Sequence, residues 1–104
     1  MVELEPGQLV LSTAGRDQGR AFLVLGFEET HHGTFVYVAD GKYRKVHRPK
    51  RKNIKHLKAT KLKEQEISNR LKTGSAVSNA ELKKAVAGLL AIYQENSEAG
   101  EGGR

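Results

Sequence analysis

The chain has 104 residues, enough for one domain whose core would bury only about 60–65% of the unfolded surface. With 38% apolar residues, 29% charged residues and a formal net charge of +6, it has the composition of a small globular protein, and a large substrate cavity is not expected. The longest apolar run, residues 85–93, is far shorter than the roughly 20 residues of a membrane span, and the first residues do not resemble a signal peptide. The absence of cysteine excludes disulfides and favours a reducing, cytoplasmic setting.

Short apolar runs bounded by turn residues predict strands in the first sixty residues. Three of them are well marked and two are weaker: residues 8–14, 20–27 and 34–40, then 43–47 and 54–60. The sequences AGRDQG, EETHHG and DGK between and after the first three have turn compositions. Pro49 is expected to bend the chain between the last two, because proline cannot donate a hydrogen bond to a neighbouring strand. Five short strands at this spacing predict a small antiparallel barrel, so the fold class is mainly β.

After residue 60 the apolar residues recur with the period of a helix. Ile67 and Leu71 lie four residues apart ahead of Gly74, which predicts a short helix that this glycine ends. Ser78 and Glu81 have the spacing of a capping box, which predicts the start of a second helix that extends to residue 96.

The second predicted helix carries a single apolar stripe. Its residues are Leu82, Val86, Leu89, Leu90 and Tyr93. The stripe must be buried, either on the barrel or on a partner; we expect the barrel, because a barrel of roughly 60 residues is only marginally stable alone. The chain therefore divides into a barrel (residues 1–60), a helical extension (61–96) and a tail rich in glycine and glutamate that we expect to be disordered (97–104).

The positive charge is concentrated in one segment. Eleven of the eighteen lysines and arginines lie between Lys42 and Lys63, and no acidic residue interrupts them. A segregated cationic field attracts polyanions, whereas the same charge scattered over the surface would mainly aid solubility. A solvated face without a partner is the alternative interpretation of such a run, but these cations lie among predicted strands and not in a tail.

The N-terminal part resembles the KOW motif. In the segment GQLVLSTAGRDQGRAFLVLGF, a strand is followed by Gly15, a short polar loop, Gly19 and a second apolar strand that ends near Gly26. Together with VYVADGKYRKVHRPKRKNIKHLKAT, residues 6–60 resemble the SH3-like KOW barrels of archaeal and eukaryotic large-subunit ribosomal proteins, and the chain is similar in length to short bacterial KOW domain-containing RNA-binding proteins. The resemblance implies an RNA-binding, ribosome-associated protein and says little about the C-terminal helices.

The resemblance implies that the loop between the two glycines and the nearby basic strands contact RNA. Gln18 departs from the basic residue often found at that position, so Arg16 and Arg20 are the stronger loop candidates. The charge pattern leads to the same region independently. The candidate RNA-binding residues are Arg16, Arg20, Lys42, Tyr43, Arg44, Lys45, Arg48, Lys50, Arg51, Lys52 and Lys55. Tyr43 lies between two cations and can be interpreted as a platform for an unpaired base or as a residue of the barrel wall.

Other functions have little support in the sequence. The four histidines have no acid or thiol at a metal-site spacing, and there is no nucleophile elbow, paired carboxylates or phosphate-binding glycine loop, so we expect no metal, no cofactor and no enzymatic activity. We expect a monomer that binds ribosomal RNA. The alternative is a protein-interaction adaptor of the transcription or translation machinery that uses the barrel and the amphipathic helix. Charge alone does not distinguish RNA from DNA; the preference for RNA comes from the resemblance.

Overall fold

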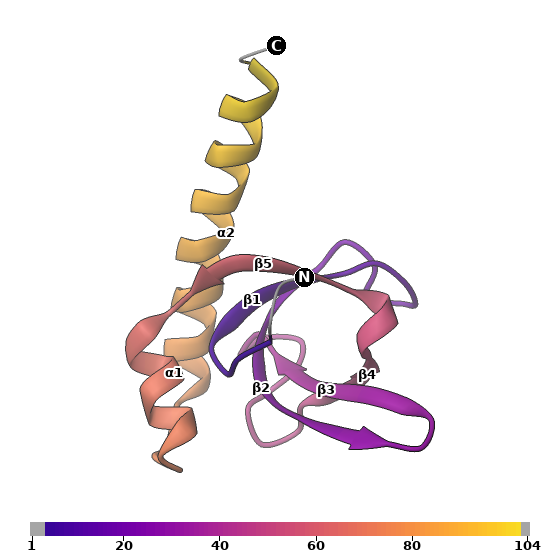
Figure 1. Ribbon diagram of the computed structural model, residues 1–104. Coiled ribbons are helices and arrows are strands. Elements are labelled where there is room, and N and C mark those ends of the chain that lie inside the picture. Colours follow the sequence, from indigo (N-terminus) through magenta and orange to yellow (C-terminus); the bar gives the residue numbers. More distant parts are fainter. Residues whose placement is uncertain (1–3, 103–104) are drawn as a thin grey trace.

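The computed structural model describes residues 4–102, with side chains up to residue 96. Five strands are followed by two helices (Figure 1). The elements are β1 (Gln8–Ser12), β2 (Ala21–Thr30), β3 (Gly33–Ala39), β4 (Lys50–Asn53), a single 3-10 turn η1 (Ile54–His56), β5 (Leu57–Lys63), α1 (Gln65–Lys72) and α2 (Asn79–Gly102). All strand pairs are antiparallel and form one sheet in the order β4-β3-β2-β1-β5. The predicted fold class, a small mainly β domain with a C-terminal pair of helices, is confirmed.

The sheet is bent into a barrel-like shape. Register shifts interrupt the β2–β3 pair between Val24 and Gly26 and the β1–β5 pair between Gln8 and Val10. Such irregularities bend a strand and increase its twist. The turn η1 then joins the two edge strands β4 and β5 directly, as Figure 1 shows. The bending brings the loops on either side of β4 within reach of the loop between β1 and β2.

Both faces of the central strands are buried, which explains why their sequences are almost continuously apolar. Alternate residues point to opposite faces of a strand. One set fills the inside of the barrel: Val10, Phe22, Val24, Val36 and Val38. The other set, which includes Leu9, Leu23 and Ala39, packs against residues of the two helices. The helices and the sheet therefore share one core on that face.

The apolar stripe of the second helix packs on this outer face of the sheet, as expected. Leu82 and Val86 are buried, and Leu89, Leu90 and Tyr93 are partly buried against the same cluster. In Figure 1, the later part of α2 continues beyond the sheet. Within residues 4–102, no helix has the length and apolar character needed to cross a membrane.

One predicted strand is wrong. Residues 43–47 form part of a loop, and the strand that pairs with β3 is Lys50–Asn53, which begins directly after Pro49. The reason is a turn at Asp40 and Gly41: the Asp40 carboxylate accepts hydrogen bonds from the backbone N–H groups of Lys42 and Arg44, both at 2.9 Å. Gly41 has a φ of +80°, which an extended strand does not adopt. The chain therefore turns back before it can continue as a strand.

The predicted tail, residues 97–104, was expected to be disordered. The structure describes only its backbone as far as Gly102, as the end of α2, and residues 103–104 lie outside the described part. This expectation remains a prediction.

The predicted capping box begins α2. The Ser78 hydroxyl accepts a hydrogen bond from the Glu81 N–H at 3.1 Å, and the Glu81 carboxylate accepts one from the Ser78 N–H at 3.0 Å. Glu81 also forms an ion pair with Arg70 of α1. The Arg70 guanidinium and the Ser78 N–H together lower the pKa of Glu81 from 4.5 to about 2. The box therefore ties the two helices together while it caps one of them.

We expect Glu81→Gln to make the protein less stable than the wild type at neutral pH, and the difference to disappear at low pH. A lowered folded-state pKa means that the carboxylate stabilises the fold above its unfolded pKa of about 4.5 and that this stabilisation is lost as the pH falls towards about 2. Glutamine retains the capping geometry, so the comparison isolates the charge. Urea unfolding of both proteins at pH 7, 4 and 2.5 measures it; a difference that stays constant with pH would show that the charge contributes nothing.

Candidate nucleic-acid interface

Three segments that are distant in sequence form one region, in which the first segment contacts each of the other two. They are the loop 13–20 between β1 and β2, the loop 40–49 between β3 and β4, and η1. The Thr13 N–H donates to the carbonyl of His56 in η1 at 2.9 Å. The side chain of Asp17 contacts that of Arg44, which links the two loops. Each segment carries predicted RNA-binding residues, so the fold brings most of these residues into one region.

Asp17 anchors this region. Its side chain is only 3% exposed, and three cations surround it. Arg44 Nη2 lies 3.2 Å from Oδ2, Arg20 Nη1 lies 3.5 Å from Oδ1, and Lys52 Nζ lies 4.0 Å from Oδ2. A buried carboxylate is stable only when it is paired and hydrogen-bonded, so these contacts compensate for its burial. Asp17 thereby fixes the loop 13–20 to β4 and to the loop 40–49.

Lys52 holds the loop and does not face solvent, which corrects its prediction as an RNA contact. It pairs across the sheet with Val36, whose side chain lies inside the barrel, and cross-strand partners point to the same face. The side chain is 7% exposed, and Nζ donates to the carbonyl of Ala14 at 3.1 Å. Lys50 precedes it on the same face and is half-buried. The sequence RPKRKN of residues 48–53 does not distinguish an inward lysine from an outward one until the strand register is known.

Arg51 is also engaged within the protein. Its side chain projects to the other face of β4, where Nε lies 2.9 Å from the Glu28 carboxylate and the guanidinium stacks on Phe35 at 3.7 Å from the ring centroid. The same carboxylate accepts a hydrogen bond from the Tyr37 hydroxyl at 2.9 Å. The hydrogen bonds from Arg51 and Tyr37 lower the pKa of Glu28, which stays charged and offsets the charge of Arg51. Arg51 is therefore a weaker candidate for phosphate binding than its sequence position suggests.

The loop 40–49 is held in place by α2. Its second residue, Gly41, lies so close to α2 that a Cβ atom there would be 2.1 Å from the carbonyl oxygen of Asn79. The Asn79 side chain accepts a hydrogen bond from the Val46 N–H at 2.7 Å. Asp40 is buried and caps the first turn of the loop. The sequence signals the Asp40-Gly41 turn, but it gives no sign that Asn79 supports this loop from a distance of 33 residues.

Five candidate residues remain exposed and have no acidic partner among residues 4–96. They are Arg16 in the first loop, Lys42, Lys45 and Arg48 in the second, and Lys55 in η1. Exposed cations that are not neutralised by their neighbours are available for phosphate oxygens. Arg20 and Arg44 are partly exposed and share Asp17, so they have a positioning role as well as a charge.

Tyr43 lies in the loop and not in the barrel wall. Its side chain is among the exposed large hydrophobic groups, at 55% exposure, and belongs to neither core cluster. The Arg20 guanidinium lies over the ring at 3.8 Å from its centroid, and Lys42 Nζ lies at 5.1 Å. The structure thus brings together an aromatic ring and two cations, one from each loop.

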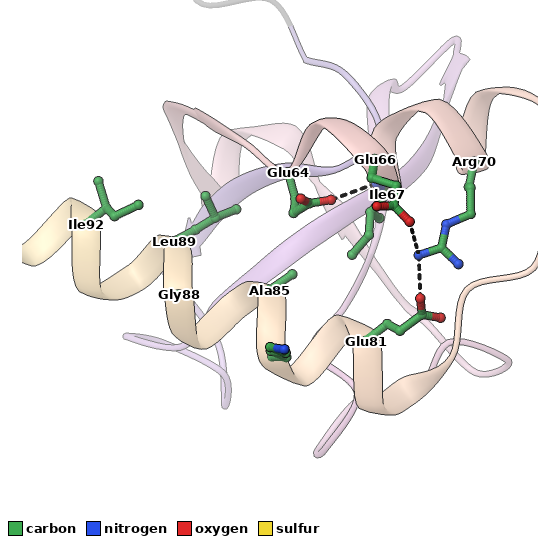
Figure 2. Close-up of a pocket in the computed structure, with 10 residues that line it drawn as sticks. Glu64, Glu66, Ile67, Arg70, Glu81, Ala85, Gly88, Leu89 and Ile92 are labelled. Carbon is green, nitrogen blue, oxygen red and sulfur yellow. Dashed lines mark hydrogen bonds and ion pairs between the residues drawn. The ribbon is translucent and has the colours of Figure 1, made fainter.

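A groove on the helical side of the molecule is separate from this region. It lies between α1 and α2 and has a volume of about 480 Å³ (Figure 2). Its lining combines apolar residues, among them Ile67, Leu89 and the exposed Ile92, with the charged residues Glu64, Glu66, Arg70, Glu81 and Lys84. Arg70 spans it and pairs with Glu66 at 3.5 Å and with Glu81. The ion pair with Glu81 links the two helices.

No group of three or more histidine and acidic side chains among the described residues could hold a metal ion. No protein-family model matches the chain, and the search of curated proteins also found no match. The resemblance to KOW proteins therefore remains a prediction from the sequence.

Proposed function

We propose that this protein binds structured RNA through the basic region formed by the loop 13–20, the loop 40–49 and η1. The observation that supports the proposal best is the set of five exposed cations without acidic partners among residues 4–96, in three segments of which the loop 13–20 contacts the other two. Two of those segments are fixed by buried aspartates, so the cations are carried by ordered backbone. The preference for RNA and the association with the ribosome rest on the resemblance to KOW proteins, and the proposed cytoplasmic location rests on the absence of cysteine.

The mechanism is electrostatic. Each lysine or arginine that settles on a phosphate releases counterions, so the affinity falls steeply as salt is added. Arginines can donate two hydrogen bonds to one phosphate, whereas lysines act as mobile point charges. Contacts of this kind position the protein on the RNA backbone and carry no sequence information themselves.

We expect Lys45→Glu with Arg48→Glu to weaken RNA binding at least about tenfold and to reduce the slope of log affinity against log salt by about two, because two phosphate contacts are lost. Both residues are exposed in the loop 40–49 and have no described acidic partner. Fluorescence anisotropy with a labelled structured RNA measures both quantities.

The matched control is Lys61→Glu with Lys84→Glu. It changes the net charge equally, at two exposed lysines outside the proposed region. Lys61 lies in β5 at the register shift between its paired residues Ala59 and Lys63, and Lys84 lines the groove between the helices. If the control weakens binding as much as the loop variant, only the overall charge matters and the proposed interface is wrong.

The second candidate function, a protein-interaction adaptor, is favoured by the groove between α1 and α2. The apolar stripe that was expected to serve as its docking surface packs on the sheet, so the groove with the exposed Ile92 is the surface that remains for it. An Ile92→Glu variant that loses a co-purifying protein and keeps its RNA affinity would support the adaptor.

A further inference from the structure

We infer that Tyr43 and Arg20 form a stacking site for one unpaired base, so that the preferred ligand is an RNA with a bulged or looped-out nucleotide beside a helix. This inference rests on the proposed RNA binding and adds to it the class of RNA that is recognised.

The ring of Tyr43 is 55% exposed and, among the described residues, lies against the cations Arg20 and Lys42. It lies in neither core cluster, whereas Val46 of the same loop packs against the core. An exposed aromatic ring next to cations is the arrangement with which proteins bind unpaired bases, because every base has a π-face. The barrel-wall interpretation of Tyr43 is thereby replaced, since the residue belongs to a loop.

The turn that carries Tyr43 is fixed before any ligand binds. The Asp40 carboxylate accepts the N–H groups of the residues on either side of Tyr43, Lys42 and Arg44, at 2.9 Å each. The carbonyl of Arg44 in turn accepts the N–H groups of Asp40 and Gly41 at 3.0 Å. A platform on ordered backbone loses less conformational entropy on binding than one on a mobile loop.

Arg20 completes the platform from the other loop. Its guanidinium lies 3.8 Å from the Tyr43 centroid, and its Nη1 atom lies 3.5 Å from the Asp17 carboxylate. Guanidinium groups stack on bases as well as on aromatic rings, so the pair offers two adjacent planar groups. Lys42 and the exposed Arg16 lie on the same two loops and can bind the phosphates that flank the base. A fully paired helix cannot use this site, because its bases are stacked on one another.

The test compares two hairpin RNAs with the same stem, one fully paired and one with a single bulged 2-aminopurine. We expect the wild type to bind the bulged RNA about tenfold more tightly and to change its fluorescence on binding, because stacking alters the emission of the exposed base analogue. Tyr43→Ala should bind both RNAs about equally, with little change for the paired one, and Tyr43→Phe should keep the preference because it keeps the ring.

The matched control is Phe27→Ala, which removes another exposed aromatic ring, 49% exposed on the β2–β3 hairpin. It should behave like the wild type. If the wild type binds both RNAs equally, or if Tyr43→Ala keeps the preference, the inference is overturned while the proposed RNA binding stands. If neither RNA binds, the proposed function fails and the inference fails with it.

Discussion

Asp17→Ala is expected to lower the free energy of unfolding by about 3 kcal/mol, because it leaves the buried Lys52 ammonium without its carboxylate. The same change releases Arg44, which lies 3.2 Å from Asp17, and frees the loop 13–20 from the loop 40–49. Urea denaturation followed by circular dichroism gives the free energy directly. RNA affinity should fall as well, since the two loops lose their fixed relative position.

Two further variants test whether the unpaired Lys52 ammonium causes the loss of stability in Asp17→Ala. Glu29→Ala removes an exposed acid on the β2–β3 hairpin and should change stability by less than about 0.5 kcal/mol. Adding Lys52→Met to Asp17→Ala removes the uncompensated charge and should recover part of the loss. If Asp17→Ala unfolds at the same urea concentration as the wild type, Asp17 is not the anchor of this region.

Gly41→Ala is expected to lower the free energy of unfolding by about 3 kcal/mol. This loss combines the strain of a left-handed backbone conformation with that of an overpacked contact. The φ of Gly41 is +80°, and a Cβ atom would lie 2.1 Å from the carbonyl oxygen of Asn79, which belongs to the backbone of α2 and cannot rotate away. The loop 40–49 would have to move off the helix. Thermal and urea unfolding both report the loss.

Gly74→Ala is the matched control for Gly41→Ala. Its φ is +78°, nearly the same, but apart from its two neighbours in the sequence no described residue has a heavy atom within 4 Å of the position that a Cβ would take. It should cost only about 1 kcal/mol, the strain of the backbone alone. If the two variants lose equal amounts of unfolding free energy, the loop 40–49 does not depend on its contact with α2.

The parts of the fold that could be predicted from the sequence are those that local chemistry determines. The apolar runs identified three strands to within a few residues, and the capping box of Ser78 and Glu81 marked the start of α2. The apolar stripe of that helix also indicated its packing on the sheet. The strand expected at residues 43–47 was wrong because a side chain, Asp40, takes the backbone N–H groups that a strand would have used.

The sequence identified the candidate residues, but it did not show which of them are exposed and which are engaged in contacts within the protein. The charge run and the resemblance together named eleven candidates, and five of them are exposed and have no acidic partner among the described residues. That these five bind RNA stays a prediction. The sequence of the charge run does not show that Lys52 points inward or that Arg51 is paired with Glu28. The orientation of Lys52 and the pairing of Arg51 depend on the register of β4 against β3 and on the neighbouring β2. The support of the loop 40–49 by Asn79 is a tertiary contact without a local signal.

The most direct test of the proposed interface is the affinity of the purified protein for a structured ribosomal RNA fragment and for a duplex DNA of equal length, each measured across a salt series. With five exposed cations available, we predict a steep decline of log affinity with log salt, with a slope that corresponds to roughly five phosphate contacts, and clearly tighter binding of the RNA. Weak binding with the same slope for both polymers would contradict the proposal and reduce the basic region to non-specific electrostatics.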